Sequence, residues 1–160
     1  MEVSWDPALA GSALTPFSVE VERGRLRAFA RATGEENPVF HDEAAARAAG
    51  HPAPLVPPTF FFCLAMEGPN PLEIYERLGV NYAHVLHGEQ HFSWHRPAFA
   101  GQTLHFEPRI GQLRLRKGGT LGLFEWHNRV RDSQGRTLAD LRSVMAVRAP
   151  TPGPGNAHAA

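Results

Sequence analysis

The sequence predicts an α+β fold in which a long antiparallel sheet wraps around a central apolar helix. Two observations lead to this fold class. After about residue 84 the chain consists of four long segments in which apolar and polar residues alternate, joined by short turn-forming stretches. Before that point, residues 59–68 (TFFFCLAMEG) are apolar around most of a helical circumference, so a helix here has to be covered on nearly every side.

The N-terminal part of the chain predicts one strand and one helix. Residues 1–15 have no regular pattern and are expected to be irregular. Apolar residues then alternate with polar ones over residues 17–21, which is typical of a strand. From Glu22 the apolar residues recur at helical spacing, and Gly34 is a suitable residue to end that helix.

A polar loop, GEENPVFHDE at residues 34–43, follows this helix. Pro38 biases Asn37 away from the helical conformation, so the stretch is expected to remain a loop. Asp42 then occupies the N-cap position of a short alanine-rich helix that ends at Gly50. Three glutamates, a histidine and an aspartate within ten residues make this loop a candidate acid/base site.

Prolines precede the apolar helix. Four of the eight residues from 51 to 58 are prolines, which argues against regular secondary structure there. Pro58 is expected in the first turn of the apolar helix, where a missing N–H does no harm. One more short helix is predicted over residues 71–79. The four strand segments, which their short turns predict to be an antiparallel meander, are residues 87–97, 103–115, 120–132 and 136–148.

Residues 1–148 are expected to form one domain, followed by a disordered tail of Pro, Gly and Ala at residues 149–160. An apolar helix wrapped by a long, twisted antiparallel sheet is the hot-dog arrangement. Such a sheet has open edges, so edge-to-edge pairing of two copies into a dimer is expected.

Composition excludes several classes of function. Sixteen Lys and Arg residues balance sixteen Asp and Glu residues, so neither nucleic acid nor an acidic membrane surface is an expected partner. No apolar run approaches the length of a membrane span. The single cysteine, Cys63, permits no internal disulfide, and a cytoplasmic location is expected.

Two stretches of the chain, FARATGEENPVFHDEAAARAAGHPAPLVPPTF and LHGEQHFSWHRPAFAGQTL, carry a family resemblance. They resemble the MaoC-like hydratase/dehydratase family, and more closely the N-terminal half of its FAS1-like dehydratase branch. The resemblance implies a hot-dog fold and a hydro-lyase activity in fatty acid metabolism. That activity is the reversible addition of water to a 2-enoyl thioester of coenzyme A or acyl carrier protein. It also implies a homodimer, or a heterodimer with a second hot-dog subunit, and no cofactor.

Carried over residue by residue, the resemblance leaves the catalytic site incomplete. Glu35 falls on the family's catalytic aspartate, but Phe40 stands where the catalytic histidine belongs and His41 comes one residue later. In an extended loop His41 would point to the opposite side, unless a one-residue bulge brings it back. The helix-opening His-Gly pair aligns with Pro57-Pro58. Because proline has no backbone N–H, Pro58 cannot donate to the thioester oxyanion.

Three functions remain open. The first is a non-catalytic or partner-dependent half of a hydratase. The second is a self-sufficient homodimeric enoyl-CoA hydratase that uses Glu35 and His41, or His87 and Glu89, which share one face of a predicted strand. A weaker third is a hot-dog acyl-CoA thioesterase acting through Glu67. The residues expected to line the substrate pocket are Asn37, Phe40, Pro58 and Thr59.

A metal site is not expected. His87, His91 and His95 are four residues apart, which on a helix would suggest metal ligands. On a strand, neighbours in this set lie roughly 13 Å apart, too far to share one ion.

Overall fold

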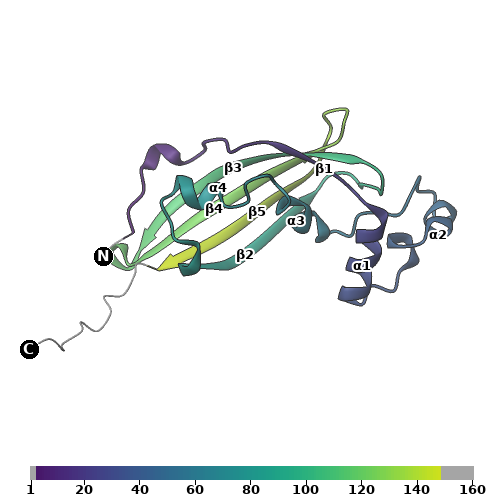
Figure 1. The fold of residues 1–160 in the computed structure, drawn as a ribbon, viewed down its shortest axis with the longest axis horizontal. Coiled ribbons are helices and arrows are strands. Elements are labelled where there is room, and N and C mark those ends of the chain that lie inside the picture. Colours follow the sequence, from purple (N-terminus) through teal and green to yellow (C-terminus); the bar gives the residue numbers. More distant parts are fainter. Residues whose placement is uncertain (1–2, 149–160) are drawn as a thin grey trace, which may run out of the picture.

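A computed structural model describes residues 3–148. Its centre is a single five-stranded antiparallel sheet with the strand order β1-β3-β4-β5-β2 (Figure 1). The strands are β1 (Phe17–Glu20), β2 (Val85–Trp94), β3 (Thr103–Arg116), β4 (Leu121–Arg131) and β5 (Thr137–Arg148). The α-helices are α1 (Arg23–Thr33), α2 (Glu43–Ala48), α3 (Phe60–Ala65) and α4 (Glu73–Arg77). The predicted α+β class is confirmed.

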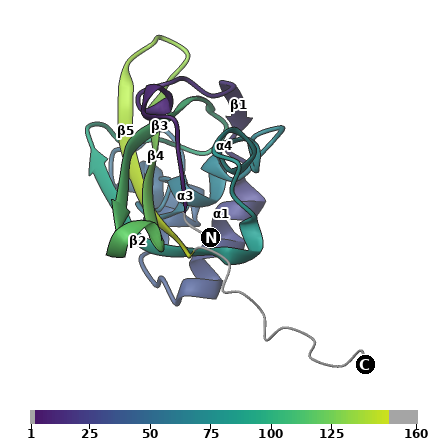
Figure 2. The same ribbon diagram turned by 90° about the vertical axis from the view of Figure 1, so that its left-hand side faces the viewer.

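Helices cover one face of the sheet, called here the inner face. Viewed end-on in Figure 2, α1, α3 and α4 lie on one side of the strands. The largest buried cluster joins Phe60, Phe61 and Leu64 of α3 to Phe106 of β3 and Leu141 of β5. The opposite, outer face of the sheet carries no helix in the part of the chain that the structure describes.

The predicted meander is correct only for the last three strands. β3, β4 and β5 follow one another through short turns, but β2 pairs with β5, from Val85↔Val147 to Trp94↔Ala139. The side of β3 that a hairpin with β2 would need is occupied by β1. Alternation predicts that a segment is a strand, but it does not say which strand will be its neighbour.

The connection between β2 and β3 therefore crosses the sheet instead of forming a hairpin. On the way it pairs with the proline-rich segment: Val56 N donates to Ala98 O at 2.8 Å, and Ala100 N donates to Pro54 O at 2.8 Å. This pairing, with a bridge between Leu55 and Phe99, gives residues 54–56 a defined path into α3.

The C-cap of α1 and the N-cap of α2 match the prediction, whereas α2 ends at Ala48 with Ala49 as its C-cap, just before the predicted Gly50. Gly34 ends α1 in the left-handed conformation, with φ of 70°. Asp42 Oδ1 accepts a hydrogen bond from Ala45 N at 2.7 Å and so caps α2. These two residues fix both ends of the polar loop between the helices.

The apolar helix is shorter than the sequence predicts. α3 runs from Phe60 to Ala65, with Thr59 as its N-cap residue, so Pro58 precedes the helix and does not lie in its first turn. Gly68 and Pro69 follow closely and favour an early end. As expected, α3 is buried over most of its circumference, but Phe62 and Cys63 are only half-buried.

The N-terminal lead-in is irregular, as predicted, but it packs along β3. Gly11 N donates to Ile110 O at 2.8 Å, and Leu14 N donates to Pro108 O at 2.9 Å. The predicted tail at residues 149–160 lies outside the described residues. No helix within residues 3–148 is both long enough and apolar enough to cross a membrane.

Candidate active site

The polar loop after α1 is folded by its own side chains. Asn37 Oδ1 accepts from Val39 N at 3.2 Å, and a 3-10 turn over Pro38–Phe40 follows. Leu55 N then donates to Val39 O at 3.0 Å, which ties the loop to the proline-rich segment. Asn37 therefore acts here as the residue that starts the turn.

The turn brings Glu35 and His41 to the same pocket. Arg27 and Arg31 of α1 form the rest of its lining. Because residues 38–40 form a 3-10 turn, the alternation of an extended chain does not apply, and His41 is not directed away from Glu35. Glu35 Oε1 accepts from Asn37 N at 2.9 Å. Phe40 is half-buried beside His41 in sequence and contributes no titratable group.

Prolines leave few backbone donors at the start of α3. Pro57 is buried and its carbonyl accepts from Phe60 N at 2.9 Å. The carbonyl of Pro58 accepts from Trp94 Nε1 at 3.1 Å. Neither proline has an N–H, so of residues 57–59 Thr59 alone carries a backbone donor. Pro58 and Thr59 are both exposed.

His87 and Glu89 do not share a face of the sheet, contrary to the prediction. A β-bulge at Gly88 makes His87 pair with Met145 and Glu89 with Val144, which are neighbours on β5 and point to opposite faces. The His87 ring packs 5.2 Å from the Phe62 ring on the inner side. Glu89 Oε2 instead accepts from His91 Nε2 at 2.8 Å. The two residues are therefore not assembled as an acid/base pair.

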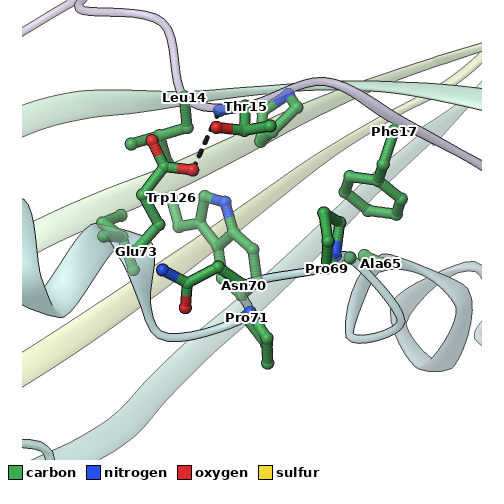
Figure 3. Close-up of a pocket in the computed structure, with 12 residues that line it drawn as sticks. Leu14, Thr15, Phe17, Ala65, Pro69, Asn70, Pro71, Glu73 and Trp126 are labelled. Atoms are coloured by element: carbon green, nitrogen blue, oxygen red, sulfur yellow. Dashed lines mark hydrogen bonds between the residues drawn. The ribbon is translucent and has the colours of Figure 1, made fainter.

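A pocket that the sequence did not predict opens on the inner face (Figure 3). Its walls come from the lead-in, the α3–α4 connection and the sheet, and the Trp126 ring lies at its centre. Thr15 N donates to Glu73 Oε2 at 2.9 Å across its rim. The apolar residues that line it include Leu14, Phe17, Ala65, Ile74, Pro108 and Trp126. Its parts are distant in sequence, so no local pattern could reveal it.

Comparison with known proteins places this geometry in a family. The family model described as "FAS1-like, dehydratase domain region" matches residues 8–141. The chain belongs to this family. A UPF0336 protein of Streptomyces coelicolor is 32% identical over 145 residues, which are 90% of this chain and 95% of the relative.

Solved structures agree with the hot-dog fold and the MaoC-like resemblance that the sequence predicts. The C-terminally truncated HadBC (3R-hydroxyacyl-ACP dehydratase) complex of Mycobacterium tuberculosis matches with a TM-score of 0.76 and 25% identity, over 86% of this chain and 96% of that one. A MaoC-like dehydratase matches with a TM-score of 0.76 and 28% identity. The match covers 89% of this chain but only 43% of that dehydratase.

Glu67, the carboxylate considered for a thioesterase, is already engaged in this FAS1-like dehydratase domain. Arg25 of α1 forms an ion pair with it, and the Arg25 guanidinium also lies 5.4 Å from the centre of the Phe60 ring. Glu67 lies beyond the end of α3 and is exposed. The geometry therefore gives no support to a nucleophile or base at this position.

Two of the three histidines considered as metal ligands, His91 and His95, have carboxylate partners. His91 pairs with Glu89, and His95 Nε2 lies 2.8 Å from Asp140 Oδ2. The hydrogen bond from His91 lowers the pKa of Glu89 below its ordinary value. Within residues 3–148, no three His, Cys, Asp or Glu side chains converge in a way that could hold a metal ion.

The outer face of the domain holds a buried carboxylate that the sequence did not single out. Glu125 on β4 is 4% exposed and is surrounded by Arg114, His127 and Arg142. Burial raises the pKa of Glu125, but the hydrogen bond from His127 and the charges of His127 and Arg142 outweigh burial, and its pKa lies below the ordinary value. This cluster depends on the register of three strands, which alternation alone does not give.

Proposed function

We propose that this chain is the non-catalytic, partner-dependent half of a hot-dog hydratase/dehydratase. The reaction would interconvert a 2-enoyl thioester and a 3-hydroxyacyl thioester of coenzyme A or acyl carrier protein. The observation that carries the proposal is the start of α3. A developing thioester oxyanion needs a backbone donor there, but Pro57 and Pro58 have none, and the Pro58 carbonyl is held by Trp94.

Proton transfer is the second function that this half would leave to its partner. Hydration requires one group to take a proton from water and another to deliver a proton to the carbon next to the carbonyl. In the polar loop, Phe40 holds the place of the histidine that the family resemblance assigns to this task. Phenylalanine carries no exchangeable proton, so the loop lacks one of the two groups in its usual position.

A second hot-dog subunit would pair at the free edge of β2. The other edge strand, β1, has four residues, whereas β2 has ten. Within residues 3–148, the edge of β2 that faces away from β5 has no strand partner. Leu86 on β2 is 67% exposed and Trp94 is 52% exposed. The HadBC relative is a complex, and the matching MaoC-like dehydratase is more than twice as long as the region matched. These observations support a hot-dog partner subunit.

The role that we assign to this half is to form part of the wall of the acyl-chain site, which the partner subunit completes. The inner-face pocket is lined mainly by apolar side chains and lies beside α3, between the lead-in and the sheet. An acyl chain gains from leaving water at about 25 cal/mol per Å² of apolar surface buried. The free space in this pocket is only about 20 Å³ and Trp126 is 4% exposed, so the pocket would have to widen in the complex before an acyl chain could contact the Trp126 ring.

The test is an assay of 2-enoyl-CoA hydration, which is monitored through the loss of absorbance of the conjugated double bond. The purified chain alone is expected to give no turnover. Activity should appear on adding a hot-dog subunit from the same genome that carries the complete Asp-x-Asn-Pro-x-His loop. Full activity of the isolated chain would contradict the proposal.

A second candidate is supported by one specific observation, the shared pocket of Glu35 and His41. In a self-sufficient homodimer these residues would act as base and acid in the displaced register. If that candidate is correct, the isolated chain hydrates enoyl-CoA and the Glu35→Ala, His41→Ala double variant does not. His87→Ala is a suitable comparison, because the bulge at Gly88 separates His87 from the Glu89 carboxylate.

A further inference from the structure

The outer face of the sheet carries a straight row of basic side chains. Arg109 on β3 is directly opposite His127 on β4, His127 is opposite Arg142 on β5, and Arg142 is opposite His91 on β2. Directly paired residues point to the same face of a sheet. Neighbouring strands are about 4.8 Å apart, so the row crosses four strands over roughly 14 Å. We call these four residues the basic row.

Placing like charges directly opposite one another destabilises a sheet. Carboxylates compensate part of the row: Glu125 contacts His127 and Arg142, and Glu89 contacts His91. Arg109 makes no ion pair with any residue in the described part of the chain, although it lies beside His127. The row therefore keeps an uncompensated cation at one end.

The basic row lines a hollow in the outer face. This groove includes three arginines but a single carboxylate, Asp140, which already forms ion pairs with Arg129 and His95. Its lining residues with charged or titratable side chains are His91, Arg109, His127, Arg129, Asp140 and Arg142. The groove thus combines a concave shape with one arginine, Arg109, that has no ion-pair partner within residues 3–148.

The His127 ring is held in place at the centre of the row. Its Nε2 lies 2.9 Å from Glu125 Oε2, which leaves Nδ1 facing away from that carboxylate; Nδ1 can donate to an anionic oxygen when the ring carries both protons. The ring also lies against the backbone of Gly111, where a Cβ atom would come within 2.6 Å of Nε2. A glycine at the β3 bulge is what allows the ring to lie there.

We propose that this groove binds a diphosphate group, held between Arg109 and Arg142 above His127. The two arginines are two strands apart, or roughly 9.5 Å between Cα atoms, which their long side chains can span from both sides. A guanidinium matches two phosphate oxygens at once, and a diphosphate offers oxygens to both arginines. The site lies on the face of the sheet opposite α3 and is separate from the acyl site proposed above.

The test is calorimetric titration of the full-length chain with inorganic pyrophosphate at low ionic strength. Arg109→Gln is expected to weaken binding about tenfold, because it removes one charge-assisted contact. Arg116→Gln removes the same charge from the same strand, outside the groove, and is expected to leave the affinity unchanged. Nuclear magnetic resonance should show the His127 ring signals moving on titration in the unmodified chain.

Coenzyme A, which contains a diphosphate, is the second probe. The groove binds the diphosphate of coenzyme A if coenzyme A competes with pyrophosphate and if Arg109→Gln also lowers the affinity for coenzyme A. If coenzyme A does not compete, but the binding of pyrophosphate still depends on Arg109, the groove binds a free anion. The proposal is overturned if pyrophosphate does not bind at millimolar concentration, or if Arg109→Gln and Arg116→Gln bind it equally well. None of these outcomes depends on hydratase activity.

Discussion

At the scale of single residues, Glu125 shows how a buried charge is accommodated in this domain. It is 4% exposed in the middle of the outer face, yet it stays ionised because His127, Arg114 and Arg142 surround it. Without those partners a buried carboxylate would have a raised pKa. The lowered pKa of Glu125 therefore depends on the register of β3, β4 and β5.

This lowered pKa predicts how acid affects stability. A group whose pKa is lower in the folded state stabilises the fold above its unfolded pKa, about 4.5 for Glu125, and that contribution is lost as the pH falls through the folded value. The free energy of unfolding should therefore fall less steeply below pH 4.5 in Glu125→Gln than in the unmodified chain. Urea unfolding at a series of pH values measures this. Glu36→Gln removes the same charge from an exposed loop position and serves as the control. Parallel profiles for all three proteins would contradict the prediction.

Gly111 provides a steric prediction at the same scale. An added Cβ would lie 2.6 Å from His127 Nε2 and 2.8 Å from Glu125 Cβ, so Gly111→Ala should lower the free energy of unfolding by about 1–3 kcal/mol. Gly24→Ala is the control, because its Cβ would meet nothing within 4 Å and alanine favours the helix α1. Chemical denaturation of both variants measures the difference. Equal stability of the two variants would show that the outer face accommodates the methyl group.

At the scale of elements, the polar loop is positioned by the caps at its ends. Asp42→Ala should lower the free energy of unfolding by about 1 kcal/mol, because Ala45 N loses its side-chain acceptor. Asp42→Asn keeps an acceptor oxygen and should stay close to the unmodified chain. Thermal unfolding of the two variants tests this. An equal loss in both would mean that the charge of Asp42, and not its hydrogen bond, stabilises α2.

How far the sequence predicts the elements depends on the range of the interaction that forms them. The caps at Gly34 and Asp42 depend on neighbouring residues, and both were predicted correctly. The partner of β2 and the bulge at Gly88 depend on a strand more than forty residues away, and no local pattern indicates either. The assignment of His87 and Glu89 to one face was wrong for this reason.

The loop shows the same limit inside the candidate site. The order of Glu35, Asn37, Phe40 and His41 indicates where a hydratase site would be built. Whether His41 could reach the Glu35 side depended on the conformation of residues 38–40, which form a 3-10 turn and not an extended chain. The pocket around Trp126 and the basic row combine residues from separate elements, so only the folded chain brings them together.

At the scale of the whole molecule, the free edge of β2 is the expected contact with a second hot-dog subunit. Leu86→Lys should weaken that association, because a charge on an exposed edge strand opposes edge-to-edge pairing. Leu115→Lys, on β3 and 46% exposed, is the matched control and should not affect it. Sedimentation of each variant mixed with the catalytic hot-dog subunit, at several protein concentrations, measures the mass of the complex. If both variants associate like the unmodified chain, the contact lies elsewhere.

The most direct test of the account concerns which subunit performs the chemistry. In the active complex with a catalytic hot-dog subunit, the Glu35→Gln, His41→Gln double variant of this chain should keep hydration of enoyl-CoA within about twofold of the unmodified complex. General acid and base groups contribute about 10²–10⁴ to a rate, so loss of working groups could not be missed. A fall of 10² or more in turnover, with the complex still assembled, would contradict the assignment of this chain as the non-catalytic half.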